Sequence, residues 1–417
     1  MPAHVAEKTA PLPRDPVRRA DRDLCLWDPL TDTFFPLDRR PRVLGKDPDC
    51  AVRLGHGTVS RRHARLEWFP EGPALVDLGS SNGVWRDGLR VDRAPLSAHR
   101  AVRLGAAPLV VVPAPAAGEA LARHGERFHT RSADLCALLQ LAEKVAPGAR
   151  PVLIGGETGT GKEWLARLLH EAGRPGGPLV PVNCGAIAAD LIGSELFGHA
   201  RGAFTGADGP RLGLVPRAAG GTLFLDEIAE LRPDHQGALL RFLENRTFRP
   251  VGSDREQVSD ARILAASHAD LEARAAGGFF REDLLYRLLD VRLTLPPLRE
   301  RLVDLPLLLE VFEAPPVPEL AWSRLVEHPW PGNLRELRLV ATRARLQGWP
   351  AALEALRPPP APTLPGAVSG PDQLRSLELD MVRGALARCG HNTSAAARAL
   401  GLPRSTLVNR MKAMGIP

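Results

Sequence analysis

The sequence predicts a multidomain chain in which a β-sandwich, an α/β domain and an all-α segment follow one another. Short apolar runs separated by Gly, Pro, Asp and Asn recur through residues 22–112, and this spacing is typical of a sandwich. In residues 127–355 strand-like runs alternate with helical stretches, which indicates a parallel sheet. Two Pro-rich segments, 113–126 and 356–371, are expected to be extended linkers, and residues 372–417 have helical periodicity.

The composition limits the class of protein. The chain has 417 residues and a net charge of +6, which suits several domains and permits binding to nucleic acid. No apolar run is long enough to span a membrane, and residues 1–21 lack the apolar core of a secretory signal, so we expect a disordered leader and no membrane partner. The five cysteines are scattered without CxxC spacing, which favours reduced thiols in the cytoplasm over disulfides or a zinc site.

A glycine-rich loop in the central part predicts a nucleotide site. Residues 151–154 form a short apolar strand that runs into the loop, and a helical stretch follows it. Glycines let backbone N–H groups converge on phosphate oxygens at the positive end of the helix, and a lysine adds a charge for the β- and γ-phosphates. The expected ATP-binding residues are Gly156, Glu157, Thr158, Gly159, Thr160, Gly161, Lys162 and Glu163. Glu163 occupies the place where the general pattern has a Ser or Thr for Mg²⁺.

Two adjacent carboxylates complete the predicted site. The apolar run 223–225 ends in Asp226 and Glu227. Asp226 is expected to bind Mg²⁺, directly or through water, and Glu227 to polarise the attacking water. Paired with the phosphate loop, this strand end predicts an ATPase that uses Mg²⁺.

A hexapeptide between these two motifs makes the prediction specific. It consists of Gly202, Ala203, Phe204, Thr205, Gly206 and Ala207. With the motifs on either side, the central part resembles the AAA+ ATPase domain of bacterial enhancer-binding proteins, which activate sigma-54 RNA polymerase. The resemblance implies an α/β subdomain at 127–298, a helical lid at 299–355, a hexamer when active, and a hexapeptide that contacts sigma-54.

The same resemblance implies roles for further residues. Asn183 matches the residue that holds the catalytic Glu227, and Ser267 and His268 stand where the family's sensor I strand usually ends in Thr-Asn. Glu163 also occurs in that family.

Three arginines complete the implied ATPase. Arg281 and Arg287 match arginine fingers that reach the γ-phosphate of a neighbouring subunit. Arg335 matches a sensor II residue that faces the nucleotide in its own subunit.

The C-terminal part predicts a helix-turn-helix. Helical runs at 374–388, 395–400 and 404–414 are separated by glycines, with Pro403 opening the third. The arrangement resembles the Fis-type module of enhancer-binding proteins, which implies binding to double-stranded DNA at an upstream site. The expected DNA contacts are Arg404, Ser405, Thr406, Asn409, Arg410 and Lys412. An ordinary helical hairpin is the alternative.

The first part carries three loop motifs in order, at 42–46, 60–63 and 79–83. They resemble those of a forkhead-associated domain, a β-sandwich that binds phosphothreonine, and imply a phosphothreonine-bearing partner such as a protein linked to a Ser/Thr kinase. Lys46 and Ser60 are implied to contact the phosphate, Arg61 and Asn82 the peptide backbone, and Ser81 to support the loop. The family usually has Arg at the position of Lys46. A sandwich that only packs on the ATPase is the alternative.

Together these patterns predict a transcription activator that binds upstream DNA and uses ATP hydrolysis to remodel sigma-54 polymerase. Its first domain receives a phosphothreonine signal. Two other classes stay open: an AAA+ remodeller with another protein or nucleic-acid target, and a DNA-binding regulator that does not hydrolyse ATP.

Overall fold

The computed structural model describes residues 24–114, 122–124, 128–188, 190–204 and 207–356. These residues belong to one unit of the chain, and residues 360–417 form a second unit. The predicted helix-turn-helix and its DNA contacts at 404–412 therefore lie outside the described residues.

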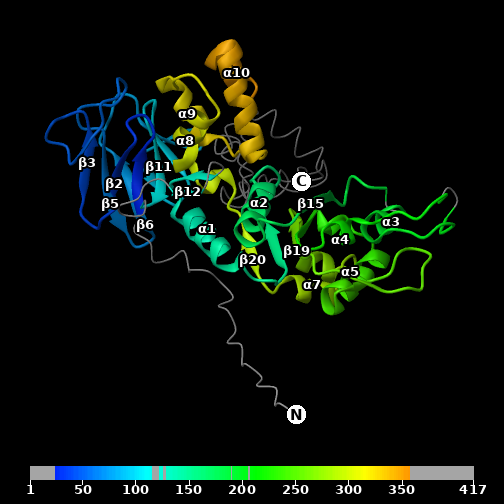
Figure 1. Cartoon of the computed structure of the whole chain (residues 1–417). Helices are drawn as coiled ribbons and strands as arrows, with labels where there is room; N and C mark the ends of the chain where they lie inside the picture. The colour runs from blue at the N-terminus through cyan, green and yellow to red at the C-terminus, as the bar shows by residue number, and fades with distance from the viewer. Residues whose placement is uncertain (1–23, 115–121, 125–127, 189, 205–206, 357–417) are drawn as a thin grey trace, which may run out of the picture. The chain divides into compact units, whose positions relative to one another are not determined.

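Two sheets, antiparallel except for the parallel pair β3–β4, form the N-terminal part, and the sequence predicts this sandwich (Figure 1). The first sheet has the order β2-β1-β11-β10-β7-β8, with β1 at Leu24–Asp28, β2 at Thr33–Pro36, β7 at Val84–Arg86, β8 at Leu89–Val91, β10 at Ala101–Leu104 and β11 at Ala107–Pro113. The second has the order β4-β3-β5-β6-β9, with β3 at Arg42–Gly45, β4 at Val52–Arg53, β5 at Ala64–Phe69, β6 at Gly72–Asp77 and β9 at Arg93–Pro95. Leucines that alternate along both sheets, including Leu44, Leu66 and Leu109, are buried between them.

Five of the short apolar runs within 22–112 are strands: the runs at 42–44, 51–54, 64–68, 74–78 and 101–104 coincide with β3, β4, β5, β6 and β10. The other strands of the sandwich were not predicted individually from the sequence. One of these, β11, is buried along nearly its whole length, because it packs inside the sandwich on one side and against helices on the other.

A five-stranded parallel sheet forms the centre of the α/β part (Figure 1). Its order is β15-β16-β19-β14-β20, with β14 at Val152–Gly155, β15 at Leu179–Asn183, β16 at Thr222–Asp226, β19 at Arg262–Ser267 and β20 at Arg292–Thr294. Alternate side chains of β16 enter two different apolar clusters, with Leu223 and Leu225 in one and Phe224 in the other. The sheet is therefore covered on both faces, as parallel sheets generally are.

Helices and short hairpins surround this sheet. The helices are α1 at Ala133–Val145, α2 at Lys162–Gly173, α3 at Ile192–Phe197, α4 at Leu214–Arg217, α5 at Pro233–Asn245, α6 at Leu271–Ala276 and α7 at Glu282–Leu288, with a 3-10 turn, η2, at Ile228–Glu230. The hairpins pair β12 at Ala122–His124 with β13 at Phe128–Thr130, and β17 at Thr247–Phe248 with β18 at Gln257–Val258. The strand β12 falls within the segment 113–126 that we expected to be a linker.

The lid is helical, as the resemblance implies. It contains the 3-10 turns η3 at Leu298–Glu300 and η4 at Leu302–Asp304, then α8 at Leu305–Val311, α9 at Glu319–Glu327 and α10 at Asn333–Glu354. Gly348 interrupts α10 with a φ of 83°, two residues before Pro350. Among the described helices none is long and apolar enough to cross a bilayer.

The sandwich and the lid share an apolar core. The cluster that holds Trp322 and Trp330 of the lid also includes Cys25, Trp27 and Val112 of the sandwich. The rings of Trp27 and Trp322 meet edge to face, with centroids 6.5 Å apart. The first domain is thus joined to the ATPase part by buried side chains as well as by the connecting chain.

Candidate functional site

The phosphate loop lies between β14 and α2, with its lysine buried. Lys162 is 7% exposed, and its Nζ donates to the carbonyl oxygens of Gly156 at 2.9 Å and Glu157 at 3.2 Å. Burial lowers the pKa of Lys162, partly offset by the charges of Glu227 and Asp226. The loop therefore holds a cation next to two carboxylates at the start of a helix, which fits a bound polyphosphate.

The lid closes directly over this loop. A Cβ on Gly159 would overlap the carbonyl oxygen of Gly332, so only glycine allows this approach, and Gly159 has a φ of 79°. The backbone N–H of Leu334 donates to Gly159 O at 3.0 Å. Arg335 is exposed, and its Cβ lies beside the same glycine, which puts its charge near Lys162.

A second set of lid contacts holds the side chain of Glu157. Arg299 donates to both carboxylate oxygens at 2.6 and 2.8 Å, and the pKa of Glu157 is lowered chiefly by these bonds. Asn333 is fully buried and donates to Glu157 Oε2 at 3.2 Å and to Thr158 O at 3.0 Å. No role was predicted from the sequence for Arg299 or Asn333, although Asn333 is part of the Pro-Gly-Asn-Leu-Arg run that contains Arg335.

The carboxylates lie at the end of β16, where the sequence predicted them. Asp226 Oδ1 accepts the backbone N–H of Glu227 at 3.0 Å. Burial raises the pKa of Asp226, and the charge of Glu227 adds to the rise, so a cation beside this carboxyl group would stabilise its ionised form. These charges also act on Cys184, whose pKa is raised to about 12, chiefly by burial.

Glu163 belongs to the exposed side of α2. It pairs with Arg167 one turn later at 2.6 Å. Thr160, by contrast, is buried, and its hydroxyl donates to Glu157 O at 2.8 Å.

Three polar side chains lie at the ends of the strands on either side of β16, and one of them contacts Glu227. His268 Nδ1 lies 2.5 Å from Glu227 Oε2. The Oδ1 of Asn183 accepts backbone N–H groups of Gly185 at 2.9 Å and Ala186 at 3.1 Å. Ser267 Oγ donates to Ala269 O at 3.0 Å, and so closes the turn after β19. The structure therefore brings His268 to the carboxylate, while Asn183 caps its own loop.

The two expected finger residues are on and beside α7. Arg281 and Arg287 are exposed, and Arg281 forms a bidentate ion pair with Asp283 at 3.0 and 2.8 Å. Two large apolar side chains near them, Phe279 and Tyr286, are 70% and 72% exposed.

The base of the hexapeptide loop is ordered by backbone bonds. Gly202 N–H donates to Ala207 O at 2.9 Å, and Ala207 N–H to Phe204 O at 3.0 Å. The Phe204 side chain is 39% exposed and packs edge to face on the His199 ring. Thr205 and Gly206 lie outside the described residues.

The candidate phosphopeptide residues gather at one end of the sandwich. Lys46 Nζ donates to Gly57 O at 2.6 Å, and Asn82 Nδ2 to Thr58 O at 2.7 Å. Ser60 Oγ accepts the backbone N–H of Ser81 at 3.2 Å. Arg61 is exposed next to Ser60.

His63 is buried below this surface and ties two of its loops together. Its Nδ1 accepts the backbone N–H of Ser60, and its Nε2 donates to Gly83 O, each at 3.0 Å. Burial lowers the pKa of His63, which favours the neutral ring that this pattern requires. These bonds give His63 a structural role, holding two loops of this surface together.

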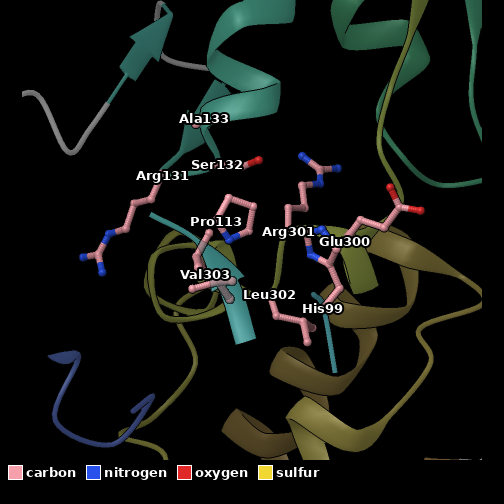
Figure 2. A pocket seen from close by; sticks show the side chains of 10 residues that line it. His99, Pro113, Arg131, Ser132, Ala133, Glu300, Arg301, Leu302 and Val303 are labelled. Carbon is pink, nitrogen blue, oxygen red and sulfur yellow. The ribbon is translucent and has the colours of Figure 1, made fainter. Parts of the chain in front are cut away.

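A narrow pocket lies where β11, the start of α1 and the lid meet (Figure 2). Val112, Arg131, Ser132, Arg301 and Val303 are among its lining residues. Arg301 is buried and donates to Thr160 O at 3.0 Å, so one wall of the pocket reaches the phosphate loop. Asp304, also buried, accepts from Thr130 Oγ1 at 2.8 Å and from the Arg131 N–H at 2.6 Å.

Comparisons with known proteins agree with this geometry. A family model described as the Sigma-54 interaction domain matches residues 128–294, one described as the FHA domain matches 42–105, and one described as Bacterial regulatory protein, Fis family, matches 373–414. The Response regulator protein PilR of Pseudomonas aeruginosa is 41% identical over 312 residues, which cover 70% of this chain and 70% of that protein. The chain belongs to the sigma-54-dependent transcriptional regulators.

Further relatives support this membership. The C4-dicarboxylate transport transcriptional regulatory protein DctD of Rhizobium meliloti is 43% identical over 296 residues, 67% of this chain; the chain spans 62% of that protein's length. A crystal structure of NtrX from Brucella abortus in complex with ADP is 32% identical, has a TM-score of 0.52 and covers 70% of each chain. The order of FHA domain, sigma-54 interaction domain and Fis-type segment confirms the predicted domain types.

Proposed function

We propose that this member of the family is an ATP-driven transcription activator that remodels sigma-54 polymerase and responds to phosphothreonine. The observation that carries the proposal is the union, in one domain, of a phosphate loop, an Asp-Glu strand end and the hexapeptide loop. Each is common alone, but the family model that spans all three is the one for sigma-54 interaction.

The substrate is ATP, bound with Mg²⁺. The loop N–H groups and Lys162 hold the phosphates, Asp226 holds the metal, and Glu227 orients the attacking water. The raised pKa of Asp226 supports a cation there, since Mg²⁺ would compensate the burial of its carboxylate. Glu157, fixed by Arg299 and Asn333, links the loop to the lid, so a change at the phosphates is passed to helix α10.

The active form is a ring, and six subunits are expected from the family. Arg281 and Arg287 act as fingers on the ATP of a neighbouring subunit. Their exposure supports a subunit contact at this helix, since a finger must reach the neighbouring subunit, and exposed Phe279 and Tyr286 add apolar area that such a contact would cover. In the ring, the hexapeptide loop with Phe204 and Thr205 contacts sigma-54, and the Fis-type segment binds upstream double-stranded DNA through Arg404 to Lys412.

The input is a phosphothreonine held by Ser60 and Lys46, with Arg61 and Asn82 on the peptide backbone. The grouping of these side chains at one end of the sandwich supports the assignment, since charge-assisted bonds to phosphate are strong. A lysine in place of arginine gives up bidentate contact, so we expect modest affinity.

The segment 56–60 is the proposed path from this input to the lid. Its carbonyls hold Lys46 and Asn82, while His56 Nδ1 lies 3.3 Å from Glu319 Oε1 on α9. Thr58 Oγ1 accepts the Ala106 N–H at 2.9 Å, and Ala106 O accepts Ser323 Oγ of α9 at 2.7 Å. A phosphopeptide that displaces Lys46 or Asn82 from these carbonyls therefore acts on groups that also touch the lid.

Transcription in a purified system tests the proposal. The full chain, ATP, sigma-54 polymerase and a DNA template with a sigma-54 promoter should yield open complexes, and a non-hydrolysable ATP analogue should not. Thr205→Ala is expected to keep ATP turnover and lose open complexes. Turnover without any effect on sigma-54 polymerase would favour an AAA+ remodeller with another target, and activation without turnover would favour a regulator that does not hydrolyse ATP.

A further inference from the structure

The catalytic carboxylate lies between two strand ends, and either can supply the group that holds it. On one side β15 ends at Asn183, which pairs with Asp226; on the other β19 ends at Ser267. In a parallel sheet the carboxyl ends of neighbouring strands meet at one edge, so side chains that follow β15 and β19 both lie next to Glu227.

The contacts favour the β19 side. His268 Nδ1 lies 2.5 Å from Glu227 Oε2, so the imidazole is in direct hydrogen-bond contact with the carboxylate. The Oδ1 of Asn183 is engaged by two backbone N–H groups of its own loop, and within the described part of the chain no hydrogen bond joins Asn183 to Glu227.

The backbone at Glu227 is also held. Glu227 has a φ of 53°, a left-handed conformation that is strained for a residue with a side chain. Asp226 Oδ1 fixes its N–H, and its carbonyl accepts from Glu230 at 2.9 Å. Strain of this kind persists only where the surroundings fix the residue, and it gathers at functional sites.

We propose that His268 is the positioning residue for Glu227, a role that rests on the proposed ATP hydrolysis. Because a carboxylate oxygen only accepts, Nδ1 carries the proton and donates to Oε2. The other oxygen, Oε1, is then free to accept a hydrogen bond from the attacking water in a fixed direction. Asn183 instead shapes the loop at 184–186.

The role concerns orientation, and stability is a minor part of it. The two side chains are 47% and 21% exposed, and ion pairs this open to water contribute little to folding. A purely structural pair would therefore change neither the turnover number nor the unfolding temperature when it is removed, whereas a positioning residue changes turnover alone.

Steady-state ATP turnover of the full chain tests the inference. His268→Ala should lower kcat about tenfold to hundredfold with KM nearly unchanged, the loss expected when a catalytic group is misplaced by about an ångström. His268→Asn should recover most of the rate, because its amide nitrogen occupies nearly the place of Nδ1. His129→Ala, which removes an imidazole outside the site, is the matched control, and thermal unfolding of each variant checks folding.

A double-variant comparison separates this inference from the proposed function. Under single-turnover conditions, His268→Ala should add no further loss to Glu227→Gln, since it acts through that carboxylate. An unchanged kcat in His268→Ala, or a loss that multiplies with that of Glu227→Gln, would overturn the role of His268 while Glu227 keeps its own. If Glu227→Gln hydrolyses ATP at the wild-type rate, both assignments are wrong.

Discussion

Two lysines in this chain, Lys162 and Lys46, donate hydrogen bonds to backbone carbonyl oxygens, but their surroundings differ in charge and exposure. Lys162 is buried, contacts two carbonyls, and has Asp226 and Glu227 close enough to act on its pKa. Lys46 lies at the surface of the sandwich, contacts one carbonyl, and is grouped with hydroxyl and amide side chains. Both are assigned to phosphate, and the first lies near the two carboxylates at the end of β16.

This difference distinguishes a site that hydrolyses a phosphate bond from a site that only binds a phosphate group. Hydrolysis needs one carboxylate to orient water, a second carboxylate to hold a metal ion, and a lysine held in one position beside the phosphates. Recognition needs charge and hydroxyl donors at a surface that a peptide can reach. The predictions below test this contrast, beginning with the largest expected effect.

Removing the carboxylate function should stop hydrolysis without stopping binding. Glu227→Gln keeps the shape of the side chain but cannot polarise water, so turnover is expected to fall about 10²–10⁴-fold. ATP affinity, measured by titration calorimetry, should stay within a fewfold. A variant that binds and hydrolyses like the wild type would take Glu227 out of the mechanism.

Replacing Lys162 by arginine should be nearly as damaging as removing it. The guanidinium is larger and planar, and overpacking a buried site costs about 1–3 kcal/mol, or roughly 5- to 150-fold in nucleotide affinity. Equilibrium binding of a fluorescent ATP analogue measures this. Affinity equal to that of the wild type would show that the lysine position is not constrained.

A lysine-to-arginine substitution at Lys46 in the sandwich should strengthen phosphate binding, whereas the substitution at Lys162 should weaken it. Lys46→Arg offers two N–H groups to a phosphate in open surroundings, so affinity for a phosphothreonine peptide should rise a fewfold, worth about 0.5–1 kcal/mol. Fluorescence anisotropy with phosphorylated and unphosphorylated forms measures it, with Ser60→Ala as the variant that loses binding. A weaker Lys46→Arg complex would mean that this lysine does not face the phosphate.

The contact between sandwich and lid should depend weakly on pH through His56. Its hydrogen bond to Asp28 raises the pKa of His56 above its ordinary 6.5, with Glu319 adding to the rise. Burial alone raises the pKa of Asp28, but its bonds to His56 and neighbours lower it below 3.8 overall. Because the pKa of His56 is higher in the folded chain than in the unfolded chain, its protonation stabilises the folded form. This contribution is complete below pH 6.5 and is lost as pH rises through the raised pKa.

Thermal unfolding between pH 6 and 9 measures this contribution. The wild type should be more stable than His56→Gln at pH 6, and the gap should narrow as pH rises. A gap that widens with pH would contradict protonation of His56 in the folded chain.

The parts of the site that lie within short contiguous motifs could be predicted from the sequence. The spacing of glycines and lysine in Gly156–Lys162 identified the phosphate loop. The apolar run before Asp226 predicted a strand that ends in both carboxylates. Because parallel strands end at the same edge of a sheet, these carboxylates were expected near the loop. The strands β5 and β6 were predicted from short apolar runs bounded by turn residues.

The sequence could not predict the side-chain pairs made over long distances. His268 and Glu227 are 41 residues apart, Arg299 and Glu157 142 apart, and His56 and Glu319 263 apart. No periodicity connects such positions, since they meet only after the sheet, the lid and the sandwich have packed. Trp27, which joins the sandwich to the lid, belongs to a strand that the pattern did not single out.

The most direct test of the account is ATP turnover by the full chain during titration with a phosphothreonine peptide selected from a library. If segment 56–60 links the two phosphate sites, turnover should change as the peptide binds, stay constant with the unphosphorylated form, and lose its response in Ser60→Ala. A peptide that binds the sandwich in a phosphate-dependent way yet leaves ATP turnover unchanged would contradict the proposed coupling between phosphothreonine binding and ATP hydrolysis.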